Sequence, residues 1–249
     1  LLCAWLAGCA PAKTPAAAGP SPQVIETSPA APLPTSTPEL VPQITLAPGE
    51  HYLRVDDQPR FVFSRNIAGY QQAHFAPMLS WTRDAGDAFV RLQLDDFGMG
   101  YRPDGSLDEN WAAQWDREFD EAQSKGIHVL PVFGVWYEWN SGPGYSMWAD
   151  NPLNQAKGGP AASPAELFKP DSVTQAAWME WMRTLVERWA PRDNILGWEI
   201  FSEVNLASGV TQSSGVAFVN HAAEVIRAAD HLDRPVTASL AETGTWPDF

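Results

Sequence analysis

The spacing of apolar residues changes repeatedly along residues 51–240 and predicts a regular succession of strands and helices. Helical spacing marks four segments: Phe75–Ala85, Asn110–Lys125, Val173–Ala190 and Gly215–Ala229. Strand patterns mark five more: Arg60–Asn66, Asp87–Asp95, Ile127–Phe133, the run that starts at Ile195, and Pro235–Leu240. Because strands that alternate with helices pair side by side in a parallel sheet, the pattern predicts an α/β fold.

Two details of the pattern concern its first elements. His51–Val55 and Arg60–Phe63 flank a turn at Asp56-Asp57-Gln58, which predicts a small hairpin before the parallel sheet. In the predicted helix Phe75–Ala85, we expect Leu79 and Trp81 on the apolar side that faces the core.

The strand Asp87–Asp95 alternates polar and apolar residues, and Arg91 lies on its polar face. In an open two-layer sheet this face would be wet, whereas in a closed barrel it would point inward. An inward arginine needs a partner because an isolated buried charge is costly. We expect Glu199, in the run that starts at Ile195, to be that partner.

The run from Ile195 to Asn205, I-L-G-W-E-I-F-S-E-V-N, is the strongest chemical signal in the chain. Its apolar part stops at Glu203, and Glu199 has the same strand parity. In a (β/α)8 barrel, catalytic side chains lie at the carboxyl ends of the strands, whereas the strand bodies form the core. The run therefore indicates a catalytic carboxylate at Glu203; a strand that ends in a solvated glutamate is the alternative.

The segment W-E-I-F-S-E, residues 198–203, resembles the W-E-x-x-N-E signature that closes the fourth strand of clan A glycoside hydrolases. Within that clan the chain is most similar to glycoside hydrolase family 5, of cellulase and mannanase type. The resemblance implies an α/β fold of the (β/α)8 TIM-barrel type, of which residues 49–249 would hold roughly the first five β/α units. It also implies that the barrel continues beyond residue 249.

The same resemblance assigns roles to individual residues. It makes Glu203 the general acid/base of a retaining hydrolysis, and it places the nucleophilic glutamate at the end of the seventh strand, beyond the present sequence. Ser202 stands where the family usually has the asparagine that binds the sugar 2-hydroxyl, and Asn66 stands at the rim of the first strand. Arg91 is similar to the arginine below the family's active site, so Arg91 and Glu199 are expected to support the site.

A long segment, Gly134–Pro170, follows the third predicted strand and would form a loop at the barrel rim. Its aromatic residues include Trp136, Tyr137, Trp139, Tyr145 and Trp148. Flat rings suit the CH faces of pyranose sugars, so Trp136 and Trp139, nearest to the strand end, are predicted to contact substrate. Packing of these rings against the barrel is the alternative. Glu138 and Asp95 are acids of the same rim that could bind sugar hydroxyls.

Composition narrows the classes of partner. The formal net charge of −14 and a pI near 4.6 argue against nucleic acid, whereas neutral polysaccharide is compatible with them. The sequence has no cluster of His, Cys and Asp with metal-ligand spacing and no Gly-rich phosphate loop. We therefore expect neither a metal nor another cofactor.

The first 48 residues have a different character from the rest. The tetrapeptide L-A-G-C at residues 6–9 matches a bacterial lipobox, in which cleavage precedes lipidation of the cysteine, here Cys9. Residues 1–9 are therefore interpreted as a signal remnant, and residues 10–48, rich in Pro, Ala, Ser and Thr, as a disordered linker. We expect a lipid-anchored protein of the bacterial cell envelope or cell surface, with its folded domain over residues 49–249.

Two functions remain open at this stage. The first is hydrolysis of O-glycosidic bonds in a β-linked polysaccharide or oligosaccharide of the β-glucan or β-mannan type. The second is a non-catalytic carbohydrate-binding or scaffold lipoprotein on a decayed barrel, and Ser202 motivates it. A glutamate at the end of a seventh strand would favour the enzyme. The sequence does not separate one β-glycan from another, or endo from exo action, and it carries no signal for the oligomeric state.

Overall fold

The computed structural model describes residues 44–46, 49–50, 52–59, 61, 63–68, 75–95, 97–232, 234–242 and 246. All of them belong to one compact unit, Ser36–Phe249. The predicted signal remnant with Cys9, and the predicted linker as far as residue 43, lie outside the described residues.

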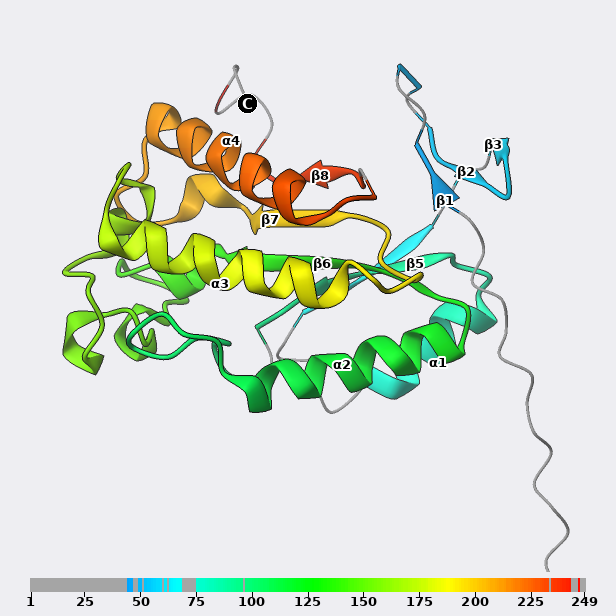
Figure 1. Ribbon diagram of the computed structural model, residues 1–249, viewed down its shortest axis with the longest axis horizontal. Coiled ribbons are helices and arrows are strands. Elements are labelled where there is room, and N and C mark those ends of the chain that lie inside the picture. The colour runs from blue at the N-terminus through cyan, green and yellow to red at the C-terminus, as the bar shows by residue number, and fades with distance from the viewer. Residues whose placement is uncertain are drawn as a thin grey trace, which may run out of the picture. The chain divides into compact units, whose positions relative to one another are not determined.

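Within the described residues, five parallel strands form the central sheet (Figure 1). They are β4 (Ser64–Ile67), β5 (Phe89–Gln93), β6 (His128–Val135), β7 (Trp198–Ser202) and β8 (Val236–Thr237). Their order in space, β4-β5-β6-β7-β8, is their order in the chain. A doubly wound sheet reverses its strand order at a switch point, whereas a barrel adds each strand beside the preceding one. The sheet is therefore the wall of a partial (β/α)8 barrel, as the sequence predicts.

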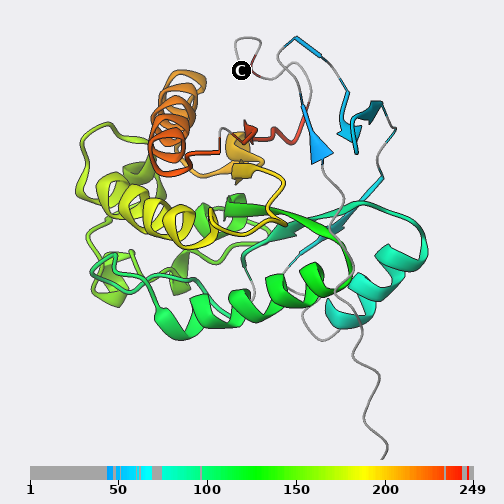
Figure 2. The ribbon, with the colours of Figure 1, turned by 45° about the vertical axis from the view of Figure 1, so that its right-hand side comes forward.

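In the same part of the chain, four α-helices connect and cover these strands. They are α1 (Phe75–Asp84), α2 (Glu109–Ser124), α3 (Val173–Trp189) and α4 (Gln212–Ala229). Figure 2 shows the helices following one another around the outer face of the sheet. Helix α4 begins at Gln212 rather than at the predicted Gly215, because Thr211 and Ser214 form a reciprocal capping box at its start. None of the described helices is long and apolar enough to cross a membrane.

Helix α1 turns a different side to the core than the sequence predicts. Phe75, Leu79 and Thr82 are buried, whereas Trp81 is 56% exposed. Two residues along an α-helix are separated by about 200° of rotation, so Leu79 and Trp81 cannot share a face. The prediction that Trp81 packs inward is wrong.

A small antiparallel sheet precedes the parallel one. Its strands are β1 (Ile44–Thr45), β2 (Arg54–Val55) and β3 (Gln58–Pro59). Asp56 and Asp57 have positive φ angles of 50° and 62°, which is the backbone of a two-residue hairpin turn. This tight turn places β3 before the predicted strand Arg60–Phe63. Strand β1 lies inside residues 10–48, so paired backbone begins earlier than the predicted end of the linker.

Aromatic residues fill the layer between the sheet and its helices. The buried tryptophans are Trp111, Trp115, Trp139, Trp148, Trp178, Trp181, Trp189 and Trp198. Their rings meet at close range, as where Phe119 of α2 and Trp189 of α3 lie edge to face at 4.8 Å between centroids. Most of the described tryptophan side chains therefore contribute to the core.

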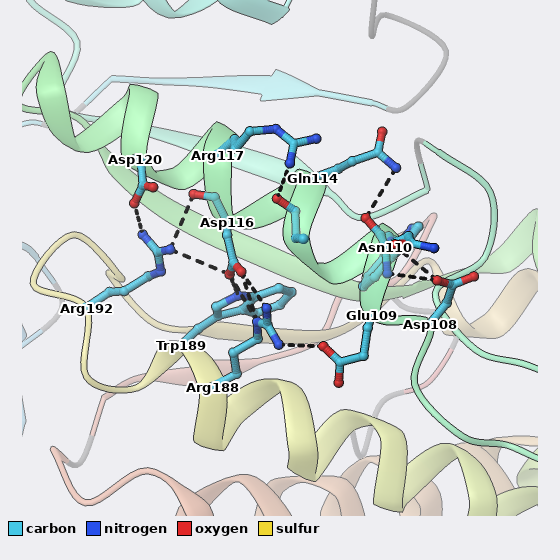
Figure 3. A network of polar contacts seen from close by, with 12 residues as sticks. Asp108, Glu109, Asn110, Gln114, Asp116, Arg117, Asp120, Arg188, Trp189 and Arg192 are labelled. Carbon is cyan, nitrogen blue, oxygen red and sulfur yellow. Dashed lines mark hydrogen bonds and ion pairs between the residues drawn. The ribbon is translucent and has the colours of Figure 1, made fainter.

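A polar network joins α2 to α3 beside this aromatic layer (Figure 3). Asp116 of α2 accepts a hydrogen bond from Arg188 Nη2 at 2.6 Å and another from Trp189 Nε1 at 2.9 Å. One turn further along α2, Asp120 accepts from Arg192 Nη1 at 2.6 Å. Because Asp116 binds two consecutive residues at the end of α3, the two helices are fixed in register.

Candidate functional site

Strand β7 carries one carboxylate of the signature segment into the interior and leaves the other at its end. All five residues of β7 are buried, and Glu199 is 3% exposed, whereas Glu203 just beyond the strand is partly exposed. Glu203 has φ 57° and ψ 48°, the left-handed conformation. The alternation that would put both carboxylates on one face therefore stops at Ser202, and the turn sets the direction of Glu203.

Arg91 and Glu199 form the predicted ion pair on the inner face of the sheet. Nε and Nη2 of Arg91 each lie 2.6 Å from one carboxylate oxygen of Glu199. Strand β6 lies between β5 and β7, so the pair spans an intervening strand. Two parallel bonds from the planar guanidinium satisfy both oxygens of a carboxylate that water scarcely reaches. The buried negative charge of β7 is thereby balanced.

Arg91 also brings Asn66 and Ser202 into the same network. Its Nη1 donates to Asn66 Oδ1 at 2.6 Å, and its Nη2 donates to Ser202 Oγ at 3.0 Å. Gln93 Nε2 donates to the same serine oxygen at 3.3 Å. Ser202 Oγ thus accepts two hydrogen bonds and keeps its own hydrogen to donate. Asn66 is exposed, whereas Ser202 is 5% exposed, so a ligand can reach the asparagine more readily.

Residues that follow strand β8 hold the turn at Glu203 through its backbone. Ser239 Oγ accepts from the Glu203 N–H at 3.2 Å, and the Ser239 carbonyl accepts from the Val204 N–H at 3.1 Å. The Ser239 N–H in turn donates to the Phe201 carbonyl at 3.0 Å. Ser239 was not predictable from the sequence, because a single serine after a short strand forms no pattern.

The segment Gly134–Pro170 is more regular than a loop. Strand β6 continues to Val135, and short 3₁₀ helices follow it. They are η2 (Trp136–Trp139), η3 (Trp148–Asp150), η4 (Gln155–Lys157) and η5 (Pro164–Phe168). These turns give the rim segment a fixed backbone on which its aromatic rings are presented.

The aromatic rings of this segment divide into buried and accessible ones. Trp139 is 0% exposed and packs on Trp148 with 5.7 Å between ring centroids. The prediction that Trp139 contacts sugar is therefore wrong, because η2 turns its ring into the core. Trp136 is partly exposed, and Tyr145 is 57% exposed with its ring 4.9 Å from that of Tyr137. Trp136 stays a candidate for sugar contact, and Tyr145 joins it.

A buried carboxyl lies at the same rim. Glu138 is 4% exposed, and burial together with the charge of Asp95 raises its pKa well above the usual value, although a hydrogen bond with the Val135 backbone acts the other way. Asn151 Nδ2 donates to the Glu138 carbonyl at 3.1 Å and to Tyr101 Oη at 3.3 Å. Glu138 and Asp95 were predicted as rim acids. Tyr101 and Asn151 were not predictable, because they are distant in sequence and lie in irregular segments.

The assembled groups suit acid/base chemistry on a neutral polyhydroxyl ligand. They are carboxylates, one arginine, and amide and hydroxyl groups on the inner face and rim. Among the described residues, no group of three or more His, Cys, Asp or Glu side chains could hold a metal ion. The roles that the sequence assigns to the site residues stay predictions, and only the role of Trp139 in sugar contact is contradicted, by its burial.

No family model and no curated protein matches this sequence. Solved structures do match. A glycoside hydrolase of subfamily GH5_18 from Streptomyces cattleya, in complex with GlcNAc, aligns with a TM-score of 0.53 at 17% identity, over 73% of this chain and 45% of its own. A β-mannanase from the blue mussel Mytilus edulis aligns with a TM-score of 0.57 at 12% identity, over 80% of this chain and 64% of its own.

An exo-β-1,4-mannosidase from an Opitutaceae bacterium aligns with a TM-score of 0.55 at 17% identity, over 73% of this chain and 32% of its own. The chain thus covers less than two thirds of the length of each of these three enzymes. The likeness lies in the fold, which is that of a partial (β/α)8 barrel similar to those of family 5 glycoside hydrolases.

Proposed function

We propose that the protein hydrolyses O-glycosidic bonds in a β-linked polysaccharide or oligosaccharide by a retaining mechanism with two carboxyl groups. The observation that carries the proposal is the position of Glu203 at the carboxyl end of β7, one strand end in a barrel wall. Catalytic groups of (β/α)8 barrels lie at this end of the strands. The neutralised pair of Arg91 and Glu199 below it supports the same assignment.

In the proposed reaction Glu203 acts first as an acid and then as a base. Its protonated carboxyl donates to the leaving glycosidic oxygen, and the resulting carboxylate later takes a proton from the attacking water. The exposed side chain of Asn66 is available to sugar hydroxyls at this face of the sheet, whereas the nearly buried Ser202 holds Arg91 and Gln93 in place. The second carboxyl group, which acts as the nucleophile, stays a prediction.

We propose a neutral β-glycan of the mannan or glucan type as the substrate class. Two of the similar solved structures are a β-mannanase and an exo-β-1,4-mannosidase. The accessible rings of Trp136 and Tyr145 offer flat surfaces to pyranose units. A formal net charge of −14 disfavours polyanionic chains and leaves neutral glycans as the compatible partner.

The experiment that tests this function compares the whole gene product with its Glu203→Gln variant on β-mannan and β-glucan oligosaccharides, with new reducing ends as the readout. We expect the substitution to lower hydrolysis by about 10²- to 10⁴-fold, the usual contribution of general acid catalysis. The matched control is Glu224→Gln on the exposed face of α4, which should keep wild-type activity. Equal turnover by the Glu203→Gln variant would remove Glu203 from the mechanism.

A non-catalytic carbohydrate-binding lipoprotein remains the second candidate. It is favoured by Ser202, which replaces the asparagine of the family signature and whose oxygen already accepts two hydrogen bonds. Calorimetric titration of the wild-type gene product with mannan oligosaccharides separates the two. Binding without release of reducing ends would support the binding protein and contradict the hydrolase.

A further inference from the structure

The turn that presents Glu203 is held by a row of hydrogen bonds from the segment after β8. In chain order, the Phe201 carbonyl, the Glu203 N–H and the Val204 N–H all bind Ser239, at 3.0, 3.2 and 3.1 Å. The next bond joins the Ala241 N–H to Asn205 Oδ1 at 2.9 Å. The two segments are therefore joined on both sides of the proposed catalytic carboxylate.

The backbone at Glu203 needs such support. Its φ of 57° lies in the left-handed region of backbone conformations, which residues other than glycine occupy at a free-energy cost. A strained conformation of this kind persists only where surrounding contacts hold it. The angle φ describes rotation about the bond from the Glu203 nitrogen to its Cα. A hydrogen bond from the Glu203 N–H to Ser239 Oγ therefore restrains this angle directly.

We propose that Ser239 is the positioning residue for Glu203: its hydroxyl oxygen holds the Glu203 N–H and so keeps the carboxyl in the direction that the turn dictates. This inference rests on the proposed function for its catalytic meaning. The hydroxyl is the part of the contact specific to serine, because the two bonds made by the Ser239 backbone survive any substitution other than proline. The proposed role of Ser239 involves no contact with substrate, because Ser239 acts through Glu203 alone.

Two variants separate the hydroxyl from the rest of the residue. Ser239→Ala removes the acceptor of the Glu203 N–H and leaves the backbone bonds to Phe201 and Val204 in place. Ser239→Thr keeps the hydroxyl oxygen and is the conservative rescue. Ser208→Ala is the matched control, because Ser208 Oγ bonds to Ser141 and Asn140 in a neighbouring segment.

The first measurement is amide hydrogen exchange at Glu203 by NMR, which needs no substrate. We expect exchange at least about fivefold faster in Ser239→Ala, in proportion to the loss of one ordinary hydrogen bond, and near wild-type exchange in Ser239→Thr and Ser208→Ala. Unchanged protection in Ser239→Ala would overturn the inference. Because this readout is independent of turnover, a wild type that hydrolyses no glycan contradicts the proposed function without touching this result.

The second measurement is kcat/KM for glycosides with poor and with activated leaving groups. A displaced acid fails most where the leaving oxygen needs protonation. Ser239→Ala should therefore lose about tenfold on poor leaving groups and little on activated ones, with activity restored in Ser239→Thr. An equal loss on both substrate types would show general destabilisation and would overturn the positioning role.

Discussion

Charged side chains on the inner face of the sheet are balanced by one another. Arg91 commits its Nε and Nη2 to Glu199 and its Nη1 to Asn66, so three strands contribute to one charge-balanced network. A buried pair of this kind is a weak source of net stability, because desolvation offsets much of the attraction. The pair is nevertheless needed, because removing Arg91 would leave the Glu199 carboxylate buried without a counter-ion. The network therefore fixes β4, β5 and β7 at the base of the site.

Glu138 provides a prediction about pH. The usual pKa of the group is 4.5, and burial followed by the charge of Asp95 raises it well above that value in the folded protein. The folded state therefore binds the proton of Glu138 more tightly than the unfolded state does. The stability that Glu138 contributes through this proton is fully present below pH 4.5 and is lost as the pH rises through the folded pKa. The slope approaches about 1.4 kcal/mol per pH unit in that window.

The test is the Glu138→Gln variant, in which a neutral amide replaces a carboxyl that must ionise. Thermal melting between pH 4 and pH 9 should show that the free energy of unfolding of the variant rises relative to that of the wild type, by up to about 1.4 kcal/mol per pH unit. Glu224→Gln, at an exposed position of α4, is the control and should follow the wild type throughout. Parallel curves for Glu138→Gln and wild type would contradict the raised pKa.

Individual residues were predictable where strand alternation governs them. The pairing of Arg91 with Glu199 follows from the parity of two strands, and the structure forms it. Trp139 was not predictable, because a 3₁₀ turn and not an extended strand sets the direction of its ring. The direction of Glu203 was not predictable either, because its left-handed backbone depends on a serine that follows another strand.

At the scale of elements, Asp116 joins α2 to α3 by accepting hydrogen bonds from Arg188 and Trp189. Burial alone would raise the pKa of Asp116, but hydrogen bonds from Arg188 and Trp189 and the charge of Arg192 hold it below the usual 3.8. Its contribution to stability is therefore present above pH 3.8 and is lost as the pH falls through the lowered pKa.

Replacing Asp116 by asparagine should destabilise the protein at neutral pH by about 1.5 to 3 kcal/mol, the range for hydrogen bonds to charged groups. Asp120→Asn is the matched control on the same helix, because Asp120 is 66% exposed in its ion pair with Arg192 and should cost at most about 1 kcal/mol. Urea unfolding of both variants measures the difference. Equal decreases in the free energy of unfolding for Asp116→Asn and Asp120→Asn would show that the network contributes only as surface charge.

Helices and strands were predicted best where apolar periodicity is long. The helices α2 and α3 match their predicted ranges closely, since each spans four or more turns of regular pattern. Their ends depend on caps, and α4 began early because its Thr211 cap carries only local information. The small hairpin turns at Asp56 and Asp57 as predicted, whereas its second strand is displaced, because β3 begins at Gln58 directly after the two-residue turn.

For the whole molecule, attachment to a membrane is a proposal that rests on residues outside the described part. If L-A-G-C at residues 6–9 is a lipobox, Cys9→Ser should move the gene product, expressed in a bacterium, from the membrane fraction to the soluble fraction. Acyl chains bind membranes through about 0.8 kcal/mol per buried methylene, so loss of several chains has a large effect. Cys3→Ser is the control and should stay with the membrane. A soluble wild type would contradict the lipobox.

The fold class was predictable at this scale because alternation of strands and helices permits few topologies. The agreement with solved barrels confirms that part of the prediction. The substrate was not predictable, because it depends on rim side chains such as Trp136 and Tyr145, whose exposure follows from turns and not from periodicity.

The chain-order arrangement of the sheet has a consequence for biosynthesis. Each strand from β5 onward pairs with the strand that precedes it in the chain, so a chain that emerges N-terminus first can add one β/α unit at a time. The pair of Arg91 and Glu199 is different, since 108 residues separate its members. In a partly formed sheet, Arg91 therefore lacks its counter-ion until strand β7 has been added. The site becomes charge-balanced only when β7 docks, so any delay before residue 199 emerges would prolong the interval in which the folding protein exposes an arginine without its counter-ion.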